Sequence, residues 1–221
     1  MEHVFVHLAS QSRLPKLKRL WLAPFDLQRK LLEKINALGA AAAAGQSTRI
    51  VAKMNALTDE AIISALIAAG RQGVQIDLIV RGACMLPAGV PGLTDNIRVR
   101  SVIGRFLEHS RVFYFRLGKA DELYLSSADW MNRNMLRRIE LAWPVTDPVQ
   151  RQRIVDECLV AYLHDGVDAW DLLPDGNYAR VNRVSRVDRA VHGAQAALMG
   201  RYSAGGRASM PSAHASVRGA R

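Results

Sequence analysis

The opening part of the chain alternates between β-like and helical segments, and this order constrains the fold more than any other feature. Strands are expected at residues 20–25 ("LWLAPF"), 48–55 ("TRIVAKMN") and 74–82 ("VQIDLIVRG"). The segments between them, residues 27–39 and 59–70, have apolar residues at helical spacing. A β-α-β-α-β order predicts an α/β fold with a largely parallel central sheet.

Residues that favour helix N-termini precede both helical segments. Asp26 is placed to cap the first helix, and Thr58 is placed to cap the second. Asp59 and Glu60 follow Thr58, and their negative charges suit the positive end of the helix dipole. The sequence therefore predicts helices that begin close to residues 27 and 59.

The pattern changes after the Gly/Pro-rich residues 84–96. Short strands are expected at residues 97–104, 111–117, 122–127 and 139–145, with little room for helices between them. This spacing predicts antiparallel pairs in the second half of the sheet. Asp147 followed by Pro148 indicates a helix start. A last helix is expected within residues 186–202, whereas the Trp/Pro/Gly-rich residues 166–181 are given no regular structure.

Composition limits the class of protein. The 221 residues include two cysteines, Cys84 and Cys158, which predicts reduced thiols and a cytoplasmic location. No apolar run is long enough for a membrane span, and residues 1–10 lack the pattern of a secretory signal. The net charge is +10. Residues 180–221 carry eight arginines and one aspartate, a net charge of +7.

The basic C-terminal segment has two interpretations. It suits a polyanionic partner, such as nucleic acid, polyphosphate or an anionic membrane surface, and it thereby leaves open peripheral attachment to a membrane. It is equally consistent with a solvated, disordered tail, because residues 203–221 contain Gly, Ser and Ala without periodicity.

Polar side chains follow several of the expected strands. In open α/β sheets, ligands bind at the carboxyl ends of the strands. Lys53 and Asn55 end one strand, Arg81 ends the next, and Ser127 ends a later one. Arginine and lysine in such places favour phosphate, because they offer charge-assisted hydrogen bonds. One such cation alone is more simply a surface charge, but together they predict a phosphate-binding crevice.

His109 is the candidate acid/base. It differs from the other five histidines in having polar and cationic neighbours at a strand entry, among them Arg105 and Arg111. A histidine among cations has its charged form disfavoured, which suits proton transfer near neutral pH. The alternative is a histidine that makes only a structural hydrogen bond.

Two family resemblances follow from these motifs. His109-x-Arg111, a strand and then "SSADWMNRN" resemble the phospholipase D superfamily, whose motif is His-x-Lys-x4-Asp. Arg111 stands where that motif has Lys and Arg116 where it has Asp, which weighs against an ordinary phosphodiesterase. The chain more closely resembles the C-terminal region of the bacterial polyphosphate kinases. Matching stretches include "RIVAKMNALTD", "IRVRSVIGRFLEHSRVFYF" and "YLSSADWMNRNMLRRIELAWPV", within residues 10–202.

The polyphosphate kinase resemblance implies a fold and a domain organisation. The fold is α/β, a phospholipase D-like mixed sheet flanked by helices. Residues 1–18 would end a preceding catalytic domain, residues 19–202 would form the C-terminal phospholipase D-like domain, and residues 203–221 would be a disordered basic tail. Full-length family members also imply a homo-oligomer.

The same resemblance implies an activity, the reversible transfer of the ATP γ-phosphoryl group to inorganic polyphosphate. His109 matches an acid/base histidine, and Arg81 and Arg138 match arginines that contact nucleotide phosphates. Mg²⁺ would accompany ATP or ADP. The family's nucleophilic histidine lies in an upstream domain, so we expect a truncated or split form that is inactive alone and needs the N-terminal domains in cis or in trans. The alternatives are a non-catalytic module that binds polyphosphate or nucleic acid, and a phospholipase D-like hydrolase.

Overall fold

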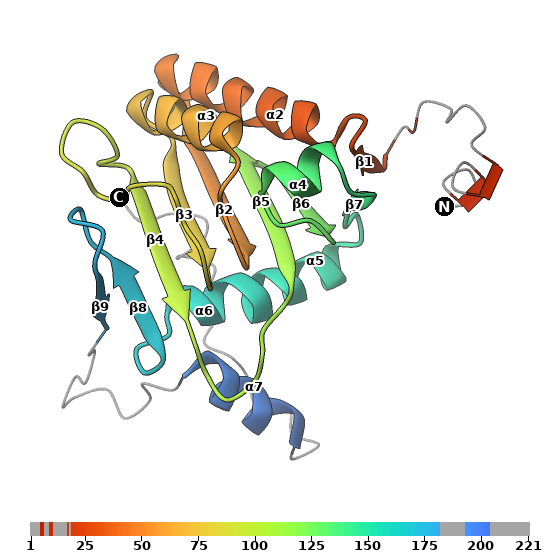
Figure 1. Cartoon of the computed structure of the whole chain (residues 1–221). Helices are drawn as coiled ribbons and strands as arrows, with labels where there is room; N and C mark the ends of the chain where they lie inside the picture. The colour runs from red at the N-terminus through yellow and green to blue at the C-terminus, as the bar shows by residue number, and fades with distance from the viewer. Residues whose placement is uncertain (1–4, 7–8, 11–16, 18, 182–192, 204–221) are drawn as a thin grey trace.

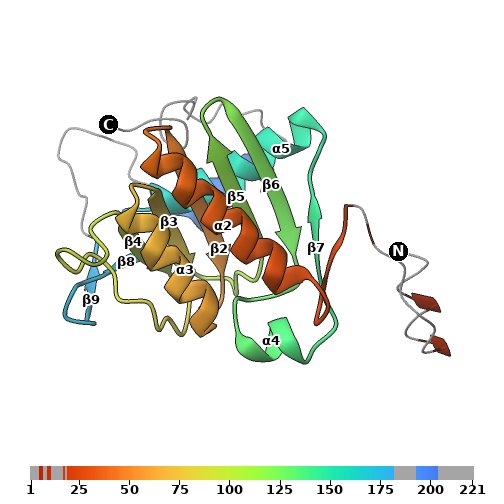
Figure 2. The same cartoon turned by 90° about the horizontal axis from the view of Figure 1, so that it is seen from above.

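The computed structural model describes residues 5–6, 9–10, 17, 19–181 and 193–203. Most of the expected N-terminal segment 1–18 and nearly all of the expected tail 203–221 lie outside these residues. The described part forms a nine-stranded mixed sheet with helices on both faces (Figures 1 and 2). The expectation of a mixed sheet flanked by helices is confirmed.

Seven strands coincide with the segments expected from the sequence, and β8 and β9 are additional. The strands are β1 (Trp21–Ala23), β2 (Thr48–Met54), β3 (Gln75–Val80), β4 (Ile97–Val102), β5 (Arg111–Leu117), β6 (Ala120–Ser126), β7 (Glu140–Pro144), β8 (Ala169–Leu172) and β9 (Tyr178–Arg180). Their order across the sheet is β1-β7-β6-β5-β2-β3-β4-β8-β9.

The expected helices are also present, together with one that was not expected, α4 (Asn132–Leu136). The others are α2 (Leu27–Ala43), α3 (Glu60–Arg71), α5 (Pro148–Ile154), the π-helical stretch η1 (Val155–Val160), α6 (Ala161–Leu163) and α7 (Ala194–Ser203). The cap of α3 differs from the prediction, because Asp59 and not Thr58 accepts a hydrogen bond, from the Ile62 N–H at 3.0 Å. A carboxylate at this position also complements the helix dipole.

The prediction of a largely parallel sheet is wrong. Within the described residues only the pairs β2–β3 and β3–β4 are parallel. Strand β1 lies at an edge of the sheet, antiparallel to β7. Helix α2 then carries the chain to β2 at the centre of the sheet, so β1 and β2 are not neighbours. Strand β4, expected among the antiparallel strands, is parallel to β3, because residues 81–96 are long enough for a crossover without a helix.

Strands β8 and β9 form a hairpin that the sequence did not predict. Strand β8 pairs antiparallel with β4, and β9 pairs antiparallel with β8 at the sheet edge. The strands have four and three residues, too few for a visible alternation. Gly176, with φ of 86°, occupies the left-handed region in the turn between them.

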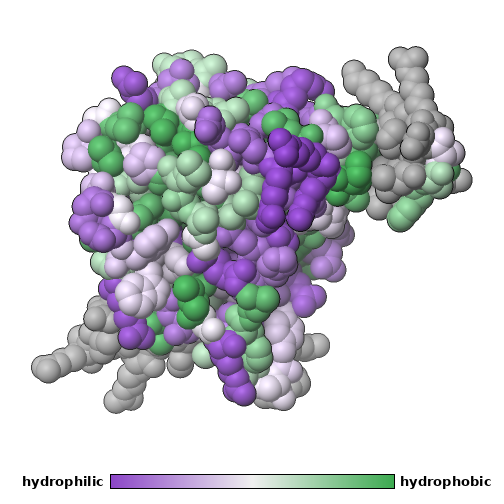
Figure 3. Space-filling model, viewed as in Figure 1, coloured by the Kyte–Doolittle hydropathy of each residue, from purple (hydrophilic) through white to green (hydrophobic). Residues whose placement is uncertain are grey.

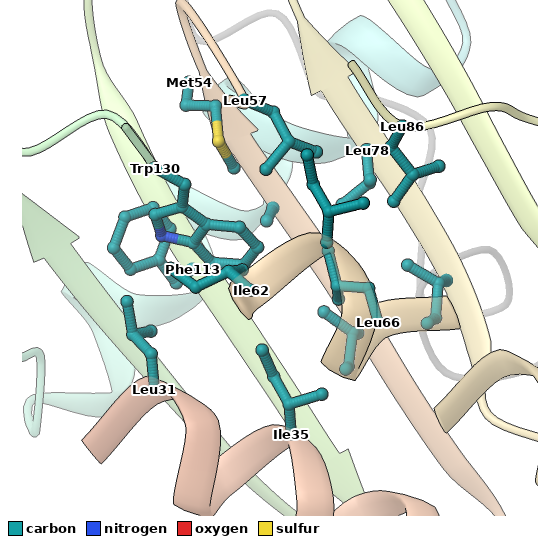
Figure 4. Close-up of a cluster of buried hydrophobic side chains, with 14 of the residues drawn as sticks. Leu31, Ile35, Met54, Leu57, Ile62, Leu66, Leu78, Leu86, Phe113 and Trp130 are labelled. Atoms are coloured by element: carbon teal, nitrogen blue, oxygen red, sulfur yellow. The ribbon is translucent and has the colours of Figure 1, made fainter. Parts of the chain in front are cut away.

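Apolar side chains pack on both faces of the sheet. On one face Leu31, Ile35, Ile62 and Leu66 from α2 and α3 meet side chains of β2, β3 and β5, with Trp130 beside Phe113 (Figure 4). The other face packs against η1, α6 and α7. Strand β5 alternates between the two faces, because its residues 113 and 115 contribute to the first cluster and residues 112 and 114 to the second.

The surface, the helices and the cysteines add three observations. Hydrophilic and hydrophobic residues are interspersed over the face seen in Figure 3. Within the described residues, no helix combines the length and the apolar character needed to cross a membrane. Cys84 and Cys158 are both free thiols, as expected.

Candidate functional site

Several polar residues gather at one edge of the sheet. Strand β5 is antiparallel to β2, so its first residue lies near the end of β2, and β6 returns to the same edge. Bridges join Leu57 to Cys84 and to Trp130, which brings together the segments that follow β2, β3 and β6. Asn55, Arg81, His109 and Arg111 therefore lie at one edge of the sheet, whereas their binding of phosphate stays a prediction. We call Asn55, Arg81, His109, Arg111 and Asp129 the strand-end site.

Asp129 holds this site together. Its Oδ1 accepts hydrogen bonds from the backbone N–H of Asn55 at 2.6 Å and from Nε of Arg111 at 3.2 Å. Its Oδ2 accepts a second bond from Nη2 of Arg111 at 2.9 Å. Burial opposes ionisation of Asp129, but Arg111 and the Asn55 N–H outweigh it and lower the pKa of this carboxyl. Asp129 is thus a buried anion that fixes Arg111 in a two-point contact.

Arg111 in turn contacts His109. Its Nη1 and Nη2 lie 3.3 Å and 3.2 Å from the Nδ1 and Nε2 atoms of the imidazole, and Nη1 donates to the His109 carbonyl oxygen at 3.1 Å. His109 itself is exposed. The guanidinium therefore positions an accessible imidazole, with positive charge beside both of its nitrogens.

Arg81 extends the same network along β3. Its Nε donates to Oδ1 of Asn55 at 3.0 Å, and its carbonyl oxygen accepts from the Ser101 hydroxyl at 2.8 Å. Within the described part of the chain, neither terminal nitrogen of Arg81 has a protein acceptor. Because Nε is held by Asn55 and both terminal nitrogens are free of protein acceptors within the described residues, the Arg81 guanidinium can bind an anion with two parallel hydrogen bonds.

Lys53 lies behind this edge rather than on its surface. It is 3% exposed, its Nζ lies 3.3 Å from Oε1 of Glu108, and Nζ lies 3.2 Å from the centre of the Tyr162 ring. Burial lowers the pKa of Lys53, although Glu108 opposes the shift. Lys53 therefore contacts the residue next to His109, and direct phosphate binding by Lys53 stays a prediction.

Glu108 is the opposite partner in this contact. Its carboxylate accepts hydrogen bonds from the Ser110 N–H at 2.8 Å, the Ser110 hydroxyl and the Tyr162 hydroxyl at 2.8 Å. Burial alone raises the pKa of Glu108, but Lys53, Ser110 and Tyr162 outweigh it and lower the pKa to about 2. The backbone on either side of His109 is thus anchored to the interior.

The remaining predicted residues lie outside the network. Arg105 was expected beside His109, but its guanidinium lies over the ring of Phe106, 5.6 Å from the centre. The Ser127 hydroxyl donates to Glu140 and accepts from the Leu141 N–H at 3.0 Å. Arg138 is exposed on the segment after α4, and within the described residues it has no ion pair. Phosphate binding by these three side chains stays a prediction.

Four residues that matter for this geometry were not among the predicted site residues. Asp129 and Glu108 are carboxylates close in sequence to candidate cations, and that proximity is a usable signal. Gln195 holds the loop before His109, because its side chain accepts from the Phe106 N–H at 2.7 Å and donates to the Phe106 carbonyl at 2.8 Å. Gln195 and Tyr162 are far from His109 in sequence, so only the tertiary structure identifies them.

Within the described residues, no group of three or more histidine, cysteine, aspartate or glutamate side chains is arranged to hold a metal ion. The two carboxylates of the strand-end region are each paired with a cation. The strand-end site presents guanidinium groups and one imidazole, and guanidinium groups suit anions with several oxygen atoms.

Comparisons with known proteins give a consistent result. Residues 20–194 match the family model described as polyphosphate kinase C-terminal domain 2. The chain is 45% identical over 202 residues to the polyphosphate kinase of Burkholderia cenocepacia and 46% identical to that of Paraburkholderia phytofirmans. In both comparisons the match covers 91% of this chain and 29% of the relative.

A solved structure gives the same picture. The polyphosphate kinase from Porphyromonas gingivalis is similar with a TM-score of 0.83 and 35% sequence identity, over 92% of this chain and 31% of that chain. The chain thus spans about three tenths of the length of the relatives that it matches.

Proposed function

We propose, from the premise that this chain belongs to the polyphosphate kinase family and corresponds to its C-terminal domain 2, that the strand-end site binds phosphate groups of ATP, ADP and polyphosphate. In this proposal it forms part of the machinery that reversibly transfers the ATP γ-phosphoryl group to polyphosphate. The network from Arg81 through Asn55, Asp129 and Arg111 to His109 carries the proposal.

The proposed roles follow from the contacts. Arg81 and the exposed Arg138 bind phosphate oxygens, and Arg111 supplies positive charge while holding His109 in place. Phosphoryl transfer depends mainly on positioning and on neutralising negative charge, and these side chains supply both. His109 donates or accepts a proton beside the transferred group. Mg²⁺ is assigned to the nucleotide, as part of the substrate.

The covalent step is assigned elsewhere. In this proposal the nucleophile that takes the phosphoryl group is a histidine of another domain of a family enzyme, acting in cis or in trans, as the family resemblance implies. The isolated chain is therefore expected to bind phosphate chains without turning them over, as a cytoplasmic domain of a larger assembly.

Binding of a polyphosphate of defined length, measured by calorimetry, tests this proposal. Arg81→Ala should weaken binding by about 1–3 kcal/mol, the usual range for a lost charge-assisted contact. Arg71→Ala is the matched control, because Arg71 is an exposed arginine at the end of α3 and should leave affinity unchanged. Equal affinity of the Arg81 variant and the native chain would remove the strand-end site from polyphosphate binding.

A further inference from the structure

A cationic cavity lies at the opposite ends of the central strands from the strand-end site. It has a volume of about 440 Å³, and its lining includes Arg49, Asp77, Arg98, Arg100, His164 and Asp171. The arrowheads of β2, β3 and β4 point the same way in Figure 1, so their starts share the edge remote from the strand-end site. Arg49 and Asn55 are six residues apart along β2, roughly 20 Å at the usual strand rise. We call this cavity the start-edge cavity.

The cavity forms where the sheet is incompletely paired. Strand β8 pairs with residues 100–102 of β4, whereas residues 97–99 have no partner in β8. The side chains of Leu163 and Leu172 also line the cavity. The site therefore combines charged groups with apolar surface, as small-molecule pockets do.

The lining has an excess of positive charge. Each carboxylate is already paired, since Asp77 accepts from Arg49 at 2.6 Å and Asp171 accepts from Arg100 at 2.7 and 3.1 Å. Arg98 is exposed and, within the described residues, has no carboxylate partner. One full cation is therefore left for a ligand.

Arg49 is a nearly buried cation in the lining. The residue is 9% exposed, and its Nε has no hydrogen-bond acceptor in the described structure. This atom has almost no accessible surface, so a ligand in the cavity does not reach it. Arg49 therefore contributes to the cavity through its paired charge, held by Asp77 at 2.6 Å.

His164 adds a polar group that is fixed in one tautomer by its partner. Its Nδ1 lies 3.0 Å from the Val160 carbonyl oxygen, so Nδ1 carries the proton and donates. Nε2 has no partner within the described residues. It is available to accept from a ligand hydroxyl, or to donate to a phosphate when the ring is protonated.

We infer that the start-edge cavity binds a phosphorylated small molecule with an apolar ring, of the size of a nucleoside monophosphate. The phosphate pairs with the guanidinium of Arg98, and the ring packs against Leu163 and Leu172. The volume lies within the usual range of about 300–1,000 Å³ for small-molecule pockets. This site is separate from the strand-end site and does not depend on the function proposed for it.

Titration of the chain with AMP, followed by backbone amide resonances and by calorimetry, tests the inference. AMP should shift the amide signals of Arg98 and His164, and Arg98→Ala should weaken binding about tenfold, as for a lost contact of about 1.4 kcal/mol. Arg98 is exposed and unpaired, so its replacement should not disturb folding. His164→Gln keeps a polar group and should weaken binding less.

Two controls separate this site from the strand-end site. Arg81→Ala and Arg71→Ala should leave AMP affinity at the start-edge cavity unchanged. Absence of shifts at Arg98 and His164 would overturn the inference. So would AMP binding that follows Arg81 rather than Arg98, because the ligand would then lie at the strand-end site.

Discussion

The Nζ atom of Lys53 lies 3.3 Å from Oε1 of Glu108, so a buried cation on β2 anchors the residue that immediately precedes His109. The ring of Tyr162, in α6, covers the Nζ atom of Lys53. This relationship joins the core of the domain to the loop that presents the candidate acid/base. It also makes the position of His109 sensitive to a residue that never reaches the surface.

Glu108→Gln should destabilise the fold. The substitution keeps the shape of the side chain but leaves the buried Lys53 without a counter-charge, at a cost of about 2 kcal/mol. Urea unfolding at neutral pH measures this loss. Glu33→Gln is the control, because Glu33 forms an exposed pair with Arg29 and its loss should cost less than about 0.5 kcal/mol. If both variants lose the same free energy of unfolding, the buried ion pair stabilises the fold no more than the exposed pair does.

Acid should weaken the fold through Glu108. Its pKa is lowered from 4.5 to about 2 in the folded state, so its contribution is complete above pH 4.5 and is lost as the pH falls towards 2. Allowing for its partial exposure, the loss is about 1–2 kcal/mol. Urea midpoints at pH 6 and pH 3 should therefore differ more for the native chain than for Glu108→Gln. A variant with the same pH dependence as the native chain would contradict this assignment.

Asp129→Asn should destabilise the strand-end site. The amide keeps one acceptor for the Asn55 N–H but loses the two-point ion pair with Arg111, which should cost about 1–3 kcal/mol. Thermal or urea unfolding measures the change. Asp175→Asn, at the exposed turn between β8 and β9, should change stability by less than about 0.5 kcal/mol. An Asp129 variant as stable as this control would refute the role given to Asp129.

Arg138→Ala should weaken polyphosphate binding and reduce its dependence on salt. Exposed contacts between cations and a polyanion are screened by salt, so removing one contact removes part of that dependence. Calorimetric titrations at two salt concentrations measure both effects. Arg133→Ala is the control from α4, a few residues earlier in the same segment. If both variants lose affinity equally, Arg138 acts only through the general charge of this surface.

The sequence predicted the strands and the longer helices of residues 20–165 because their periodicity is a local property, whereas the five-residue helix α4 was missed. Strand pairing is not local, so the positions of β1 at the edge and of β4 beside β3 could not be predicted from order alone. The β8–β9 hairpin was missed because its strands are too short to show alternation.

The site was predictable to a similar extent. Asn55, Arg81, His109 and Arg111 follow or precede strands, and topology brings these positions to one edge. Whether a lysine or arginine side chain is exposed to solvent is less predictable from the sequence. Lys53 was expected at the surface of the crevice, but the side chain enters the layer between β2 and Tyr162 and is buried there. Which face a strand residue occupies depends on the whole sheet.

The central claim is that His109 serves phosphoryl transfer, and a chimeric enzyme tests it most directly. This chain would replace the matching region of the Burkholderia cenocepacia polyphosphate kinase, with which it shares 45% identity. The measurement is polyphosphate synthesis from ATP, for the chimera and for its His109→Ala variant. Lys119→Ala, in the exposed turn between β5 and β6, is the control.

The account predicts an active chimera whose turnover falls by about 10²–10⁴-fold in His109→Ala, the usual contribution of a positioned acid or base, and stays unchanged in Lys119→Ala. Affinity of the His109 variant for polyphosphate should remain close to that of the parent chimera. Near-normal turnover of an active His109→Ala chimera would contradict the account and leave this domain as a module that binds phosphate chains.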